Sequence, residues 1–109
     1  MTIVDRLSSL RARCRNMPTS AGIYRMLDDR GQVIYVGKAR HLRKRVSSYF
    51  NRQAGATAKV RAMIASIESI EVTITANENE ALILESNLIK RLKPRYNVML
   101  RDDKSFPHI

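Results

Sequence analysis

The chain has 109 residues, 44% of them hydrophobic, which are the size and composition of one modest globular domain. It contains no run of about 18 apolar residues and no apolar leader near its N-terminus, so we expect no membrane span, no signal peptide and a cytoplasmic location. Lys and Arg number 20 against 10 Asp and Glu, and this net charge of +10 favours a polyanionic partner, nucleic acid before an anionic membrane.

The first predicted element is an N-terminal helix. Apolar residues recur at helical spacing over residues 3–15, and Pro18 follows them and stops the helix. The single cysteine, Cys14, lies in this segment. One cysteine excludes an intrachain disulfide and a zinc site made of cysteines, so we expect Cys14 to be a helix residue without a chemical role.

A β-hairpin is predicted next. Two β-like runs, residues 23–27 and 33–36, flank the turn-forming residues 28–31. Gly37 shares one face of the second strand with Tyr35. We expect Gly37 to end that strand and to let another group approach the backbone closely.

Helical and strand-like patterns alternate after the hairpin. Apolar spacing predicts two helices, a third strand and a long helix, and Asn77 with Glu80 forms a capping pattern before the last of these. These elements are expected at residues 40–50, 57–66, 70–75 and 77–92, with a polar loop at 51–55 and a short segment near 98–100.

The charges are distributed unevenly. From Gly31 to Ile67 the chain has no Asp or Glu, whereas a solvated helix face usually mixes both signs. We therefore expect this stretch to contact the phosphate backbone of a nucleic acid without reading its bases. The residues predicted to bind it, which the resemblance described below makes DNA, are Gly37, Lys38, Arg40, Arg43, Lys44, Arg45, Arg52, Lys59 and Arg61.

Glu85 is the most unusual residue of the long helix. Its neighbours on the helix surface are the apolar residues Ala81, Leu82, Leu88 and Ile89. An unpaired carboxylate in the middle of a core-facing stripe would cost several kcal/mol or would stay protonated. We therefore expect a divalent cation or an arginine beside Glu85.

Two short motifs support a family assignment. They are Gly22-Ile23-Tyr24 and Ile34-Tyr35-Val36-Gly37. The second motif opens the stretch IYVGKARHLRKRVSSYF, and the stretch ANENEALILESNLIKRLKPRYNVMLRDDKSFP follows later in the chain. From about residue 16 to residue 109 the chain resembles the GIY-YIG nuclease superfamily, and within it the N-terminal endonuclease domain of the bacterial excinuclease subunits of the UvrC family.

The resemblance implies an α/β (α+β) domain in which a three-stranded antiparallel sheet is flanked by helices, in agreement with the element pattern. It implies a phosphodiesterase that uses one Mg²⁺ or Mn²⁺ ion and makes the incision 3′ to a lesion in nucleotide excision repair, part of the bacterial SOS response to DNA damage. The partners would be damaged duplex DNA, without base-sequence specificity, and UvrB, through a segment outside this chain. We therefore expect residues 1–109 to be an N-terminal piece of a longer bacterial protein.

The same resemblance implies roles for single residues. Glu85 would bind the metal ion. Either Tyr24 or Tyr35 would accept a proton from the attacking water, with Tyr24 preferred and Tyr35 orienting the water or contacting the phosphate. Lys38, Arg45 and the metal ion together would stabilise the phenolate and lower the tyrosine pKa.

Further roles follow for residues on the helix after the hairpin and near the C-terminus. Arg45 would bind the scissile phosphate, and Tyr49, one turn later, would hold Arg45 or contact the phosphate. Asn97 would orient its neighbours or a water, or serve only as a turn residue. His41 is a second candidate for proton transfer, although a surface position is the simpler interpretation.

Two alternatives remain open. A noncatalytic nucleic-acid-binding module would explain the charge, but it would need no metal and would tolerate Glu85→Ala. A stand-alone UvrC-like nuclease, or a homing or restriction enzyme of the GIY-YIG type, would keep the chemistry and change the biological process.

Overall fold

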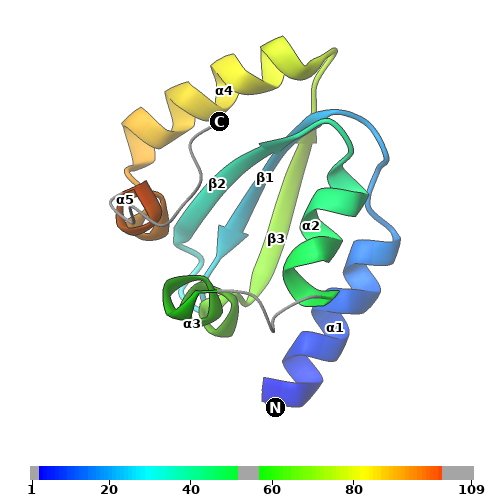
Figure 1. Ribbon diagram of the computed structural model, residues 1–109, viewed down its shortest axis with the longest axis vertical. Helices are drawn as coiled ribbons and strands as arrows, with labels where there is room; N and C mark the ends of the chain where they lie inside the picture. Colours follow the sequence, from blue (N-terminus) through cyan, green and yellow to red (C-terminus); the bar gives the residue numbers. More distant parts are fainter. Residues whose placement is uncertain (1–2, 52–56, 102–109) are drawn as a thin grey trace.

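The computed structural model describes residues 3–51 and 57–101. The elements follow the order α1 (Ile3–Arg15), β1 (Gly22–Leu27), β2 (Val33–Ala39), α2 (Leu42–Asn51), α3 (Ala58–Ser66), β3 (Ser69–Ile74), α4 (Glu78–Leu92) and α5 (Arg95–Arg101). The strands form one antiparallel sheet in the order β2-β1-β3 (Figure 1). The expected fold class, a three-stranded antiparallel sheet flanked by helices, is confirmed.

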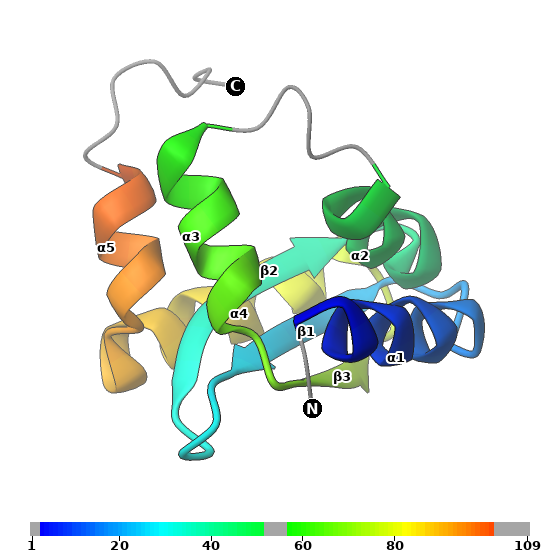
Figure 2. The same ribbon diagram turned by 90° about the horizontal axis from the view of Figure 1, so that it is seen from below.

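The helices cover different parts of this sheet. Helices α1 and α2 pack against each other, and α2 contacts β1 and β2. Helix α4 runs alongside β2, at the edge of the sheet opposite β3 (Figure 1). Helices α3 and α5 lie side by side in both ribbon views (Figure 2). The outer edge of β2 is therefore bordered by α4 and α5, and the candidate active site lies along this strand.

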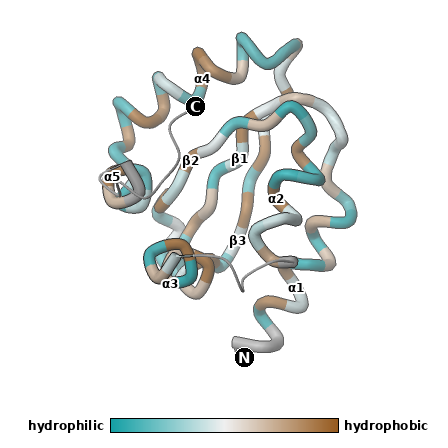
Figure 3. Tube along the Cα trace, viewed as in Figure 1, coloured by the Kyte–Doolittle hydropathy of each residue, from teal (hydrophilic) through white to brown (hydrophobic). Residues whose placement is uncertain are grey.

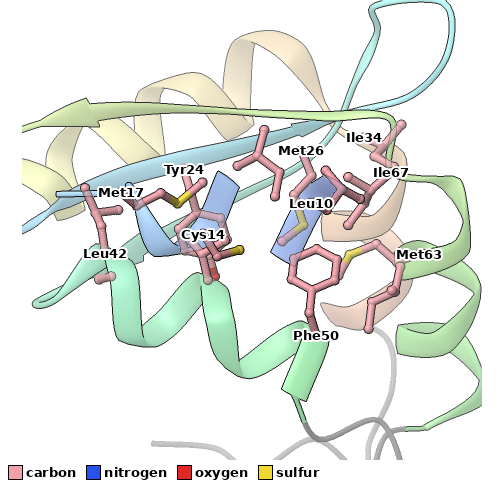
Figure 4. Close-up of a cluster of buried hydrophobic side chains, with 14 of the residues drawn as sticks. Leu10, Cys14, Met17, Tyr24, Met26, Ile34, Leu42, Phe50, Met63 and Ile67 are labelled. Atoms are coloured by element: carbon pink, nitrogen blue, oxygen red, sulfur yellow. The ribbon is translucent and has the colours of Figure 1, made fainter. Parts of the chain in front are cut away.

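The main core lies between the sheet and helices α1, α2 and α3 (Figure 4). Tyr24 and Met26 of β1 point into it together with Leu42 of α2 and Met63 of α3, all at most 1% exposed. Each such side chain contributes about 1.5–3 kcal/mol by leaving water. Cys14 is buried in the same cluster, and burial raises the pKa of its thiol, as expected for an inert helix residue.

The second strand is longer than its sequence pattern predicts. It continues through Gly37 to Ala39, so the expectation that Gly37 ends the strand is wrong. Gly37 pairs with Tyr24 of β1, and Ala39 pairs with Gly22. A glycine in this register weakens the strand only modestly because the neighbouring strand supplies the backbone partners on that side.

Helix α2 begins two residues later than predicted. The ring nitrogen Nδ1 of His41 accepts a hydrogen bond from the Lys44 backbone N–H at 3.2 Å and so caps the helix. Position 51 is the last residue of α2, and the rest of the expected polar loop lies outside the described residues.

The long helix and its end follow local rules closely. The Asn77 side chain accepts a hydrogen bond from the Glu80 N–H at 2.8 Å, which confirms the predicted cap of α4. Lys93 ends the helix in the left-handed region, with φ of 46°, and the buried Pro94 follows. A full helix, α5, then replaces the short segment expected near residues 98–100. Among the described residues, none of the helices is long and apolar enough to cross a membrane.

Candidate active site

Three tyrosines form the centre of the candidate site. The ring centroids of Tyr24, Tyr35 and Tyr49 lie 5.9 to 6.4 Å from one another. The hydroxyl groups of Tyr24 and Tyr49 are hydrogen-bonded at 2.8 Å. Tyr24 is only 1% exposed, whereas Tyr35 and Tyr49 are half-buried, so the cluster extends from the core to the surface.

Strand register and one glycine bring the tyrosines together. Tyr35 pairs with Met26, two residues from Tyr24, so both tyrosine rings project from the same face of the sheet. The Tyr24 ring occupies the space where Gly37 has no side chain, and a Cβ on Gly37 would overlap the end of that ring. The close approach predicted at Gly37 thus occurs, and the approaching group is Tyr24.

Arg45 contacts this cluster from α2. Its guanidinium lies 5.5 Å from the ring centroid of Tyr49, and the residue as a whole is exposed. The phenol oxygens of Tyr24 and Tyr49, with a weaker contribution from Tyr35, raise the pKa of Arg45, which keeps it cationic. Arg45 therefore offers a positive charge at the surface end of the tyrosine cluster, where a phosphate can reach it.

The tyrosine pKa values differ from the sequence prediction. Burial raises the pKa of Tyr24, Tyr35 and Tyr49 above their ordinary value of about 10, and the charge of Arg45 offsets only part of this effect. The expected lowering therefore does not come from Arg45 alone and would need the metal ion that the prediction included. Desolvation of the phenolate outweighs one nearby guanidinium.

Lys38 lies on the other face of β2 from the tyrosine rings. As the neighbour of Gly37 it points to the opposite side of the strand. Its ammonium pairs with the Glu78 carboxylate at 3.5 Å, and Arg40 binds the same carboxylate. The two cations are thus partly neutralised, which sequence spacing could not predict because Glu78 is about 40 residues away.

Glu85 lies on α4 near the outer edge of β2. It is half-buried, and burial raises its pKa, while the charge and the backbone N–H of Lys38 oppose that shift. The Glu85 charge in turn helps to raise the pKa of Tyr35. Glu85 therefore lies beside Lys38 and close enough to Tyr35 for its charge to act on that phenol.

The helix around Glu85 is less buried than predicted. Of its four neighbours only Ala81 is fully buried, Leu82 is 48% exposed, and Leu88 and Ile89 are half-buried. The prediction of a carboxylate in the middle of a core-facing stripe is therefore wrong in degree. Helix α4 contacts the edge strand β2, and hydrophobic and hydrophilic residues alternate along its trace (Figure 3). Some of its apolar side chains, such as Leu82, therefore stay exposed.

Asn97 binds the backbone at the edge of β2. Its Oδ1 accepts a hydrogen bond from the Val36 N–H at 2.7 Å, and its Nδ2 donates one to the Val36 carbonyl at 2.9 Å. The amide thereby replaces a neighbouring strand and protects an otherwise open sheet edge. Sequence reasoning identified Asn97 but missed this partner, since nothing in the local pattern links residues 61 positions apart.

Among the described residues, the remaining predicted DNA contacts lie on helices α2 and α3. Arg43 donates to the Met17 carbonyl at 3.0 Å, and Lys59 donates to the Met99 carbonyl at 3.3 Å. Lys44 is exposed on α2 and Arg61 on α3. Arg61 also interacts with another group of the protein. Arg52 lies outside the described residues.

The donor set at Glu85 fits a hard cation that keeps most of its water. Among the described residues, no three His, Cys, Asp or Glu side chains lie close enough to hold an ion alone. Mg²⁺ often binds through one or two carboxylates plus substrate phosphates, whereas structural zinc needs four protein ligands. A half-buried carboxylate with a raised pKa is also stabilised by a nearby cation.

The fold and this cluster define a class of protein, a small α/β domain in which tyrosines, an arginine and a carboxylate line an edge strand. The chain matches the UvrC-like GIY-YIG domain over residues 20–98. It belongs to that family.

Curated relatives share this domain. The chain is 59% identical to UvrABC system protein C of Coxiella burnetii (strain RSA 331 / Henzerling II) over 95 residues, which are 87% of this chain and 15% of the relative. It is 59% identical to the protein of the same name from Legionella pneumophila (strain Lens) over 93 residues, 85% of this chain and 15% of the relative. The chain thus spans only 15% of the length of these relatives.

A solved structure has the same fold. The GIY-YIG N-terminal endonuclease domain of UvrC from Thermotoga maritima, bound to magnesium as its catalytic divalent cation, matches with a TM-score of 0.72 and 38% identity over 81% of this chain and 94% of that chain. Point mutants of that domain, with a tyrosine or an asparagine replaced, also bind the divalent cation.

Proposed function

We propose that this domain is a DNA endonuclease that hydrolyses a phosphodiester bond with one divalent metal ion. The observation that supports this most strongly is the contact of Tyr35, Tyr49 and Arg45 with one another, beside a Glu85 carboxylate whose charge acts on Tyr35. The magnesium-bound Thermotoga maritima domain supports the same chemistry.

Glu85 would hold the ion, Mg²⁺ or Mn²⁺, through its carboxylate. When bound, such an ion supplies Lewis acidity and neutralises charge on the scissile phosphate and the leaving oxygen. The single carboxylate leaves the other coordination positions to water and phosphate, as Mg²⁺ prefers.

Tyr35 is the better candidate for accepting the proton of the attacking water. Tyr35 is half-buried, and the Glu85 charge affects its pKa. Tyr24, in contrast, is only 1% exposed, and its hydroxyl is already hydrogen-bonded to Tyr49. We therefore revise the preference for Tyr24 and assign it an orienting role, in which its hydroxyl fixes Tyr49. Because its raised pKa keeps Tyr35 protonated at neutral pH, it would accept a proton only where nearby positive charge stabilises its phenolate.

Arg45 would bind the scissile phosphate and offset the negative charge that grows in the transition state. Its planar guanidinium can donate two parallel hydrogen bonds to phosphate oxygens. Tyr49 keeps it in place through the face of its ring. Lys38 and Asn97 would act indirectly: Lys38 faces Glu85 and Glu78, and Asn97 fixes β2.

We further propose that the domain belongs to a longer UvrC protein of the bacterial cytoplasm and makes its 3′ incision in nucleotide excision repair. The identity of 59% to UvrABC system protein C supports this process over a homing or restriction enzyme. Damaged duplex DNA would be the substrate, contacted through its backbone, and UvrB would bind other parts of the longer protein.

Nicking of supercoiled plasmid tests the nuclease proposal. The parent chain should nick in Mg²⁺ or Mn²⁺ and stop in EDTA. Glu85→Gln should lose about 10² or more in rate while keeping its DNA affinity. Glu71→Gln is the matched control, because Glu71 is an exposed carboxylate of β3 paired with Arg25.

Each alternative makes a different prediction in this assay. A noncatalytic binding module would bind DNA and nick at the same background rate with and without metal. Equal nicking by the parent and by Glu85→Gln would refute the assignment of the metal to Glu85.

A further inference from the structure

A second stretch of the chain lacks acidic residues. Residues 86–101 contain no Asp or Glu, yet include Lys90, Arg91, Lys93 and Arg95. A segment with one sign of charge favours an anionic partner for the same reason as the earlier stretch. None of these four residues belongs to the site described above.

The backbone concentrates these cations at one corner of the molecule. Helix α4 ends at Leu92, the left-handed Lys93 and buried Pro94 turn the chain, and α5 starts at Arg95. All four basic residues are exposed. We call this group, Lys90, Arg91, Lys93 and Arg95, the α4–α5 corner. It lies on the opposite side of the molecule from α1 (Figure 1).

Two of the cations line a hollow. Lys93 and Arg95, with Leu92, form one wall of a hollow of about 530 Å³, and residues 31–34 of the hairpin form the other. None of the residues that line this hollow is acidic. Arg95 also stacks over Tyr96 at 5.0 Å, and its charge helps to lower the pKa of the nearby Asp28 carboxyl.

The corner differs from the basic residues near the start of α4. There Lys38 and Arg40 share the Glu78 carboxylate. The side chains of Lys90, Arg91 and Lys93, in contrast, make no hydrogen bond or ion pair with another residue in the described ranges 3–51 and 57–101. Their charges are therefore available to a ligand.

Helix stabilisation explains only part of this charge. Lys90 and Arg91 occupy the last turn of α4, where cations contribute about 0.3–1 kcal/mol against the helix dipole. Lys93 and Arg95 lie beyond the helix end, and a left-handed position favours glycine or asparagine over lysine. Helix stability therefore does not explain why Lys93 and Arg95 lie beside the hollow.

We propose that the α4–α5 corner binds a backbone phosphate of the nucleic acid substrate, with Lys93 and Arg95 as the donors. This inference rests on the proposed function. Lys93 follows Glu85 by eight residues, which is about 12 Å along the helix axis. One DNA strand rises about 3.4 Å per nucleotide, so the bound phosphate lies about three to four nucleotides from the cut.

The salt dependence of DNA binding tests this proposal. We would measure anisotropy of a short fluorescein-labelled duplex in EDTA, which prevents cutting, for the parent chain, Lys93→Asn and Arg95→Gln. Asparagine is chosen because it tolerates the left-handed backbone at position 93. Arg15→Gln, at the exposed end of α1, removes the same charge far from the corner.

Each corner variant should lower the slope of log K against log salt by about 1 and weaken binding about 5–10-fold near 0.1 M salt. Arg15→Gln should change neither quantity. Equal effects of all three variants, or unchanged slopes in the corner variants, would overturn the phosphate site. A lower unfolding temperature with an unchanged slope would show a purely structural role and would also overturn it. A parent chain that neither binds nor nicks DNA would instead refute the proposed function, and the inference with it.

Discussion

Gly37→Ala should disorganise the tyrosine cluster from a position that has no side chain of its own. The new Cβ would meet the ring of Tyr24, with even the Cε1 atom only 2.8 Å away, and that ring is fully enclosed by the core. Tyr24 must therefore shift, and its hydrogen bond to Tyr49 must lengthen or break.

The cost can be worked from three contributions. Overpacking a core costs about 1–3 kcal/mol. Loss of the hydroxyl hydrogen bond adds about 1 kcal/mol. Replacing a strand glycine by alanine returns about 0.5–1 kcal/mol. The free energy of unfolding should therefore fall by about 2 kcal/mol, which lowers the unfolding temperature by about 8 °C for a domain of this size.

Thermal unfolding and plasmid nicking would be measured together. Gly31→Asn is the control, since Gly31 has open space around it and a φ of 77° that asparagine tolerates. Gly37→Ala should lose nicking at least about 10-fold at temperatures where it is still folded, since misplacing catalytic groups by about 1 Å is costly. Combining it with Tyr24→Leu should be less destabilising than the sum of the single changes. A Gly37→Ala protein as stable and as active as Gly31→Asn would refute the reasoning.

Three other changes give separate tests. Arg45→Lys keeps the positive charge but loses the planar guanidinium, so the nicking rate should fall about 10²-fold with little change in unfolding temperature. An unchanged nicking rate would show that Arg45 does not bind the scissile phosphate. Asn97→Ala removes the side chain that binds the Val36 N–H and carbonyl, so the free energy of unfolding in a urea titration should fall by about 2 kcal/mol. The affinity for Mn²⁺ should stay within about 3-fold of the parent value. Unaltered stability would contradict the edge-protecting role. Burial raises the pKa of Tyr24, Tyr35 and Tyr49, so the stability they contribute is complete below about pH 10 and is lost as pH rises from there through their folded pKa values. Urea midpoints should therefore begin to fall near about pH 10 and keep falling above it, and a midpoint that rises there would contradict the assigned burial.

Local patterns in the sequence were sufficient for most of the fold. The helix at residues 3–15, the hairpin and the cap at Asn77 depend on spacing and on hydrogen bonds within one turn, and all three occur as predicted. Strand β2 was predicted too short because a glycine normally ends a strand. Here Gly37 remains in the strand, because its missing side chain is what admits the ring of Tyr24.

Contacts between distant segments could not be read from the sequence. Periodicity placed Glu85 on an apolar stripe. It could not show that α4 borders an edge of the sheet, where Leu82 is left half exposed. It offered no reason to pair Lys38 with Glu78 or Asn97 with Val36. The burial that raises the tyrosine pKa values was missed for a related reason, since desolvation depends on how deeply the folded chain encloses each ring.

The most direct test of the account is whether Glu85 holds the divalent ion, measured as Mn²⁺ binding by electron paramagnetic resonance without any substrate. The parent chain and Glu71→Gln should each bind one Mn²⁺ with the same affinity, and Glu85→Gln should bind at least about 10-fold more weakly. Equal Mn²⁺ binding by Glu85→Gln and by the parent would contradict the metal site at the edge of β2, and with it the mechanism built on that carboxylate.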